Sequence, residues 1–214
     1  MNTLYGYLSS GSSVDQFSQR TSGDFDDQRP AVKGQNPKMI FTKTEIGGVI
    51  VIDTEPFEDE RGFFARLWSR TEFEAQGIEA AVVECNISFN NRKGILRGLH
   101  YQCSPHEQAK IIRCTKGAIF DVAVDLRPNS PTLHRWTAVE LNESNHRALF
   151  IPVGCAHGYQ TLTDVSEVFY QTSAYYHPEC GRGMLWNDPA FGIQWPLPDP
   201  IMIERDQTYP PVGA

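Results

Sequence analysis

Short segments rich in β-branched and aromatic residues recur along this chain between residues 39 and 178, and turn-forming residues separate them. GGVIVIDTEPF, AVVECNISFN, KGILRGLHYQ and SEVFYQTSAYYHP are four of these segments. Such spacing predicts β-strands joined by tight connections. The chain has neither a repeat of about 20 to 50 residues nor the strand–helix alternation of a parallel sheet. We therefore expect an all-β domain built as a sandwich, jelly roll or barrel.

The two ends of the chain differ from this central pattern. Residues 1–38 are rich in Ser, Gly, Asp and Gln without apolar periodicity, so we expect a flexible extension ahead of a folded domain at residues 39–214. One short helix is predicted at residues 69–76, where acidic residues come early and Gly77 follows. The proline-rich segment at residues 195–212 cannot form a central strand, so we expect it to run across the mouth of the barrel.

Charge and cysteine content exclude several functions. The net charge of -7 argues against nucleic acid as a partner, and no apolar run has the roughly 20 residues that a membrane helix needs. We expect a cytoplasmic protein with no membrane partner. The cysteines are odd in number and form no C-x-x-C pair, so the sequence predicts reduced thiols and indicates neither a disulfide framework nor a zinc knuckle.

The segment RGLHYQ places Arg97 and His100 inside an apolar strand. Side chains alternate between the two faces of a strand, and strict alternation would send Arg97 and His100 to opposite faces. A glycine inside a strand often marks a bulge, which shifts the alternation by one residue. A bulge at Gly98 would therefore bring both side chains to a common surface.

Further polar side chains sit in similar apolar surroundings. His157 follows a Pro-x-Gly turn in IPVGCAHGYQTL, and Lys110 begins the apolar strand KIIRC. A core histidine and strand-packing tyrosines are the structural alternative, but together these groups suit the removal of a proton next to a carbonyl. Histidine can serve as the base, a cation can stabilise the enolate, and a phenol on the opposite face can return the proton. The candidate phenols are Tyr170, Tyr175 and Tyr176.

Five ordered motifs resemble one family of nucleotide-sugar enzymes. RGLHYQ, AKIIRCTKGAIFDVAVDLRPNSPT, IPVGCAHGYQTL, VFYQTSAYYHPE and WNDPAFGIQWP are similar to the dTDP-4-dehydrorhamnose 3,5-epimerases over about residues 45–211. The resemblance implies a cupin-type jelly roll with short flanking helices that works as a homodimer without metal or cofactor. It also implies inversion of C3 and C5 in a dTDP-4-keto-6-deoxyhexose, a step of deoxysugar and surface polysaccharide biosynthesis.

The resemblance assigns roles to individual positions of this chain. His100 corresponds to the base and Asp206 to the carboxylate that orients it, Lys110 stabilises the enolate, and Tyr170 is the acid. The implied substrate-binding residues are Arg61 at the diphosphate near the dimer contact, Arg97 beside the sugar, Tyr175 stacked on the base, and His157, Gln102, Glu84 and Asn86. Two positions depart from the family pattern near the nucleotide end: Glu84 replaces a common Gln, and Arg66 replaces an acidic residue.

Three other functions compete with this interpretation. A related enzyme could epimerise C3 alone or C5 alone, because the motifs do not separate these outcomes. A metal-binding cupin would use His100, Glu107 and His157, but Gln102 stands where such proteins carry a further histidine, and an amide is a poor replacement. A nucleotide-sugar binding protein without activity would have no need for His100, Lys110 and Tyr170 together.

Overall fold

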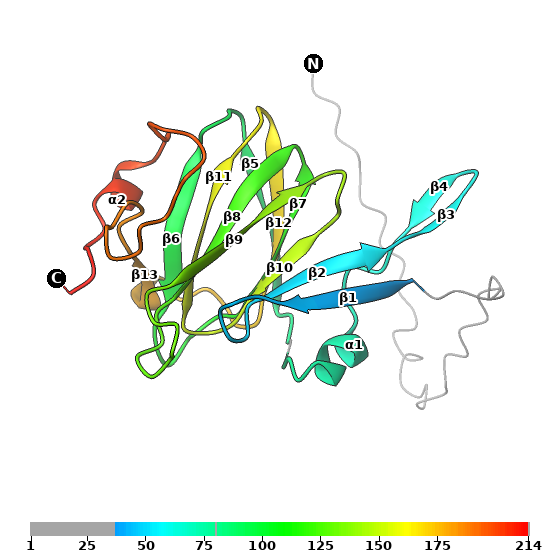
Figure 1. Ribbon diagram of the computed structural model, residues 1–214, viewed down its shortest axis with the longest axis horizontal. Coiled ribbons are helices and arrows are strands. Elements are labelled where there is room, and N and C mark those ends of the chain that lie inside the picture. The colour runs from blue at the N-terminus through cyan, green and yellow to red at the C-terminus, as the bar shows by residue number, and fades with distance from the viewer. Residues whose placement is uncertain (1–36, 80, 214) are drawn as a thin grey trace, which may run out of the picture. The chain divides into compact units, whose positions relative to one another are not determined.

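Two antiparallel sheets face each other in the computed structural model, which describes residues 37–79 and 81–213 (Figure 1). The six-stranded sheet has the order β1 (Lys38–Lys43), β2 (Ile50–Glu55), β10 (Ala148–Ile151), β7 (Lys110–Lys116), β12 (Ser166–Thr172), β5 (Glu84–Asn90). The five-stranded sheet has the order β13 (Gly181–Gly183), β6 (Leu96–Gln102), β11 (Cys155–Thr161), β8 (Ala118–Asp125), β9 (Trp136–Asn142). The all-β sandwich is confirmed, whereas the predicted extension at residues 1–38 lies, except for its last two residues, outside the described part of the chain.

Short elements flank the sandwich. Helix α1 (Arg70–Ala75) forms within the predicted residues 69–76, and Gly77 follows its cap with a φ of 72° that favours glycine. No helix in the described ranges is both long and apolar enough to cross a bilayer. The elements not predicted are the hairpin β3 (Phe57–Asp59) and β4 (Gly62–Phe64), the 3-10 helix η1 (Pro178–Cys180), strand β13 and helix α2 (Glu204–Gln207).

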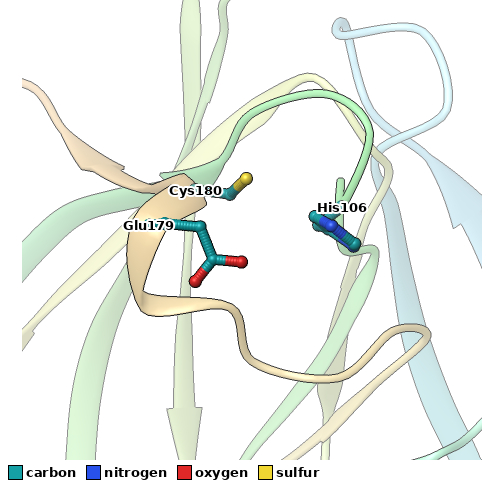
Figure 2. A group of neighbouring side chains, drawn as sticks. All are labelled: His106, Glu179 and Cys180. Atoms are coloured by element: carbon teal, nitrogen blue, oxygen red, sulfur yellow. The ribbon is translucent and has the colours of Figure 1, made fainter.

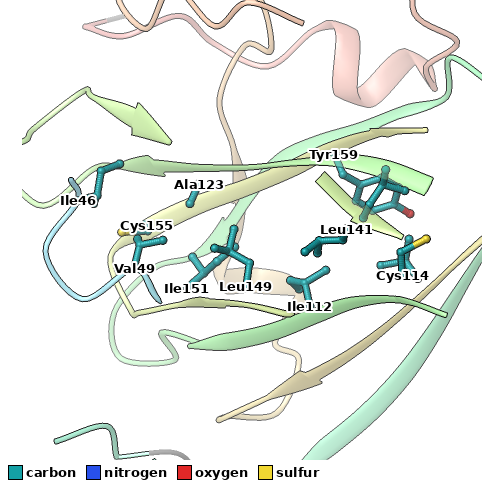
Figure 3. Packing of buried hydrophobic residues seen from close by; sticks show 12 residues of the cluster. Ile46, Val49, Ile112, Cys114, Ala123, Leu141, Leu149, Ile151, Cys155 and Tyr159 are labelled. Atoms are coloured by element: carbon teal, nitrogen blue, oxygen red, sulfur yellow. The ribbon is translucent and has the colours of Figure 1, made fainter. Parts of the chain in front are cut away.

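Alternating side chains divide the core into layers. On β7, Ile112 points between the sheets, whereas its neighbour Ile111 packs on the outside. Figure 3 shows the inner layer, in which Ile112 and Leu149 of one sheet meet Ala123 and Leu141 of the other. A second layer lies where α1 covers the six-stranded sheet, and a third lies beneath the segment after β13 on the five-stranded sheet. The apolar inner layer holds the two sheets together and thereby positions the polar side chains that share the interior.

A bulge interrupts β6 at Gly98. His100 lies opposite His157 of β11 and Arg97 lies opposite Tyr159, so residues 98 and 99 of β6 together face one residue, Gly158. Gly98 has a φ of 118°, and a Cβ there would lie 2.6 Å from the Cα of Gly158. Only glycine fits this crossing without strain. The predicted bulge is confirmed, and it turns both Arg97 and His100 toward the space between the sheets.

Candidate active site

One end of the sandwich interior is a polar cavity of about 590 Å³. Both sheets contribute to its wall, through β6 on one side and β5, β7 and β12 on the other. The segment that carries α2 closes a further side. The lining residues are Glu84, Asn86, His100, Tyr101, Gln102, Gln108, Lys110, Tyr170, Thr172, Tyr176, Pro178, Gly181, Arg182, Arg205 and Tyr209.

His100 lines the cavity and is paired with a buried carboxylate. Its Nε2 lies 3.0 Å from Oδ1 of Asp206, and the side chain of His100 remains 31% exposed. Burial lowers the pKa of His100 below its ordinary value, and the bond to Asp206 opposes this effect. The imidazole is therefore neutral at physiological pH, which is the form that can accept a proton.

Asp206 is held by three donors at once. The backbone N–H of Gly98 donates to Oδ2 over 3.2 Å, while His100 and Arg205 contact Oδ1. Burial raises the pKa of this carboxyl group, but the bond from His100 and the other donors outweigh it, so the pKa lies below its usual value. The bulge at Gly98 thus serves twice, because it directs His100 inward and supplies a donor that keeps Asp206 ionised.

Lys110 begins β7 and presents its side chain to the same cavity. Burial lowers the pKa of Lys110 to about 8, with the charge of Asp121 acting in the opposite direction. Asp121 is fully buried, and Nε2 of His157 lies 2.7 Å from its Oδ1. Burial raises the pKa of Asp121, against the influence of His157 and Lys110. Lys110 is a cation near neutral pH, and its low-dielectric surroundings strengthen its electrostatic interaction with any nearby anion.

Tyr170 lies on the wall across from His100. It belongs to β12 of the six-stranded sheet, whereas His100 belongs to β6 of the other sheet. Burial raises the pKa of the Tyr170 phenol, and the nearby charge of Arg97 lowers it in part. The phenol therefore keeps its proton and can donate it. A ring bound between these strands would have a base on one side and an acid on the other.

Four predicted substrate-binding residues are not among those that line the cavity. Arg61 is exposed on the β3–β4 hairpin and is paired with Asp59. The Nε of Arg97 donates to Asn90 Oδ1 over 2.9 Å, in the facing sheet. The other two are His157, which lies buried behind the cavity wall, and Tyr175, which is exposed.

Gln102 reaches the cavity but uses its amide to hold loops. Its Nε2 donates to the carbonyl oxygens of His106 and Tyr175, and its Oε1 accepts from the backbone N–H of His177. This use of the amide argues against a metal at the cupin position. His100 and His157 also have their Nε2 atoms engaged by carboxylates.

Several cavity residues escaped prediction. Arg182 and Arg205 add positive charge to the lining, and Tyr209 adds an aromatic face beside Tyr176, which the sequence already indicates as a candidate phenol. Arg205 precedes the predicted Asp206, so its proximity could have been inferred from the sequence. The position of Arg182 depends on β13 pairing with β6, and no sequence pattern indicated that pairing.

The fold and the site define the class of this protein as a cupin-like jelly roll with a ligand-sized pocket, lined by ionisable side chains, between its two sheets. The family model for dTDP-4-dehydrorhamnose 3,5-epimerase matches residues 43–213. The chain belongs to this family, as its motifs predict.

Individual relatives agree with this placement. The dTDP-4-dehydrorhamnose 3,5-epimerase of Shigella flexneri is 44% identical over 169 residues, which cover 78% of this chain and 93% of the relative. The Bacillus anthracis enzyme of the same name, solved with TDP and PPi bound, has a TM-score of 0.79 and 36% identity, and the match covers 82% of this chain and 100% of that one. A dTDP-6-deoxy-D-glucose-3,5-epimerase of Legionella pneumophila in complex with dTDP-4-keto-L-rhamnose has a TM-score of 0.77 and 36% identity, with 81% and 93% covered.

Proposed function

We propose that this chain is an isomerase that inverts C3 and C5 of a dTDP-4-keto-6-deoxyhexose in deoxysugar biosynthesis. The observation that carries the proposal is the cavity in which His100 and Tyr170 stand on opposite walls with Lys110 between the same sheets. Family membership supports the substrate class. A cytoplasmic setting and the absence of nucleic-acid and membrane partners remain predictions from the sequence.

The reaction begins with His100 as the base. The C4 ketone acidifies the protons at C3 and C5, and the neutral imidazole removes one of them. Asp206, bonded to the same ring, stabilises the imidazolium that forms. The electron pair moves onto the C4 oxygen as an enolate, which the ammonium group of Lys110 stabilises electrostatically.

Inversion requires the proton to return from the other face. Tyr170 donates its phenolic proton to the carbanionic carbon from the opposite wall, and the ketone re-forms with inverted configuration. His100 then releases its proton to solvent and Tyr170 regains one from solvent, after which the same steps proceed at the second carbon. Arg205, which lines the cavity and contacts Asp206, adds positive charge that favours the anionic intermediate and the diphosphate.

The nucleotide end of the substrate is proposed to lie between Glu84, Asn86 and the rim of the cavity, with Tyr175 stacked on the base and Arg97 beside the sugar. Gln102 and His157 would act by holding the cavity wall. These roles extend the sequence predictions, and the lining positions of Glu84 and Asn86 on β5 support them.

A homodimer would bring Arg61 to a diphosphate. The outer face of β5 exposes Ile87 at 63% and Phe89 at 56%, and the β3–β4 hairpin exposes Phe63 and Phe64. Apolar patches of this kind mark protein contacts. We expect a second copy to cover them and to carry its Arg61 toward the partner's cavity. Light scattering should give twice the chain mass, and Phe89→Asp should yield monomers.

Solvent exchange tests the reaction directly. A dTDP-4-keto-6-deoxyglucose sample in D₂O should take up deuterium at both C3 and C5 when the enzyme is added, as followed by NMR. Uptake at one carbon alone would identify a mono-epimerase, and no uptake would defeat the proposal. Tyr170→Phe should keep exchange while impairing inversion, so an unchanged product yield would remove Tyr170 from the role of acid.

A further inference from the structure

A second cluster of reactive side chains lies beside the rim of the cavity, apart from the groups proposed to act on the sugar. His106, Glu179 and Cys180 each place one ligand atom within 4.8 Å of the other two. Figure 2 shows that these side chains converge from two loops, one between β6 and β7 and the other around η1. Imidazole nitrogen, carboxylate oxygen and thiolate sulfur are the three donor types that bind zinc in proteins.

A neighbouring histidine fixes two of these ligands. Nδ1 of His177 lies 2.9 Å from Oε1 of Glu179, and its ring stacks on that of His106 with centroids 3.5 Å apart and planes at 14°. An ion binds a histidine in the plane of its ring, so two stacked rings cannot both reach one ion. His177 therefore serves as an outer partner that orients His106 and Glu179, as the supports of metal ligands usually do.

A second cysteine, Cys103, lies next to this cluster. The backbone N–H of Cys103 donates to the carbonyl oxygen of Cys180 over 3.0 Å. Zinc in structural sites almost always has four ligands. The three convergent ligands leave one position for water or, after rotation of its side chain, for the Cys103 thiol, and Cys180 is buried, so water competes less for that ligand.

The distances between the three ligand atoms are slightly too long for a bound ion, and a small movement of the side chains would close them. At zinc–ligand distances of about 2.0 to 2.3 Å, tetrahedral ligands lie roughly 3.3 to 3.8 Å from one another. The three ligand atoms lie within 4.8 Å, so closure requires a movement of about 1 Å at side chains such as His106 and Glu179. His106 is half-buried and Glu179 is exposed, so each side chain can make this small movement while it stays in contact with His177.

The two loops that carry these ligands also form part of the cavity wall. Gln102 already ties them together through the carbonyl oxygens of His106 and Tyr175. Gln108 of the first loop lines the cavity, and so do Tyr176 and Arg182 of the second. An ion between the loops would fix this rim in the way that the Gln102 amide does, but with stronger bonds.

We infer that Cys180, His106 and Glu179 form a binding site for one zinc-class divalent cation that joins the two loops at the rim of the substrate cavity, with Cys180 as its thiolate ligand. The site does not depend on the proposed reaction. Its role is to hold the loops, because its ligands do not line the cavity.

Cobalt titration tests the site on the full chain, reduced and stripped of metal with a chelator. One equivalent of Co²⁺ should produce the near-ultraviolet absorption of a cobalt–thiolate bond, and Zn²⁺ should abolish it by displacement. Cys180→Ser should remove this absorption. His177→Ala should weaken binding about 10- to 100-fold, as loss of an outer partner does. Cys85→Ser, at an exposed cysteine on β5, is the matched control and should bind Co²⁺ normally.

Thermal unfolding gives a second measurement. Zn²⁺ at a hundredfold excess over Kd should raise the Tm of the wild-type chain by about 5 to 10 °C. His106→Asn, at a half-buried position, should reduce this shift and carries the test if Cys180→Ser does not fold. The inference is overturned if folded wild-type protein shows no cobalt–thiolate absorption, or if Cys180→Ser retains it.

Discussion

Two histidine–carboxylate pairs stand side by side in this fold, on the neighbouring strands β6 and β11. His100 and His157 are direct partners in the strand register, and each places Nε2 within 3.0 Å of an aspartate oxygen. The His100 side chain is 31% exposed and faces the cavity, whereas the His157 side chain is 10% exposed. The same pair of groups therefore occupies two different environments.

The origin of each carboxylate explains the difference. Asp121 comes from β8, the strand next to β11, so the sheet itself fixes the His157 pair. Asp206 comes from α2 and reaches His100 from outside the sheet. A pair fixed inside a sheet can support the fold and the charge of Lys110, whereas the His100 pair faces the cavity and is the one we propose to exchange a proton with a ligand. The two pairs have the same chemical groups but differ in their access to the cavity, so we assign them different roles.

Removing the exposed imidazole should have the largest effect. We expect His100→Asn to lower the rate of deuterium exchange about 10³- to 10⁴-fold, the contribution of a positioned general base. The position is partly exposed, so stability should change little. Single-turnover exchange followed by NMR gives the rate, and circular dichroism checks the fold. A variant that keeps wild-type exchange would assign the base to another residue.

Replacing the carboxylate of the same pair should have the next largest effect. Asp206→Asn retains an oxygen that can accept from Gly98 but loses the negative charge that favours the imidazolium, so kcat/KM should fall about 10²-fold, the lower end of the range for general acid–base catalysis. Burial holds the pKa of His100 below its ordinary 6.5, and Asp206 raises it. The acidic limb of the wild-type rate profile should therefore lie below pH 6.5 and move lower in Asp206→Asn. A limb that moves upward would contradict this assignment.

The buried pair should respond in the opposite way. His157→Asn leaves Asp121 without its ring partner in a fully buried position, so the free energy of unfolding should fall by about 1–3 kcal/mol. Exchange activity should fall less than 10-fold when measured well below the unfolding temperature. Urea unfolding gives the stability. Equal losses of activity in His157→Asn and His100→Asn would remove the distinction between the pairs.

Lys110 should give the smallest change, a shift in pH dependence. Its pKa of about 8 means that the ammonium form is lost as pH rises through that value, so wild-type activity should decline there. In Lys110→Arg the charge persists to higher pH, and the basic limb should move upward even if the maximal rate falls. Lys110→Met, which has no charge, provides the comparison. A basic limb that stays near pH 8 in Lys110→Arg would assign it to another group.

Local patterns made much of the fold predictable. Alternating apolar segments located the strands, an acidic start followed by Gly77 located α1, and a glycine within an apolar strand located the bulge at Gly98. The hairpin β3–β4 was not predicted because each of its strands has only three residues. Both phenylalanines of β4 are exposed, so the hairpin has no buried face that would give a regular apolar pattern. Periodicity can indicate only those elements that the core requires.

Site residues that lie in recognisable sequence motifs could be predicted. Residues that reach the site only through the pairing of distant strands or loops could not. His100, Lys110, Tyr170 and Asp206 could be named in advance, although the roles assigned to them remain proposals. Arg182 depends on a late strand pairing with β6, and Cys103 meets Cys180 through loops that are distant in sequence. Spacing rules for cysteine motifs consider neighbours along the chain, so they cannot detect a pair assembled by folding.

The proposed base and acid belong to different sheets, and this has a consequence for stereochemistry. The gap between His100 on β6 and Tyr170 on β12 is set by how thickly residues such as Ile112 and Leu141 pack between the layers. Facing sheets stand about 10 Å apart when their side chains interdigitate. In the proposed mechanism, the outcome at each sugar carbon, retention or inversion, depends on the thickness of an apolar layer whose residues do not line the cavity. A change of core volume is a way to alter product ratio without altering a reacting group.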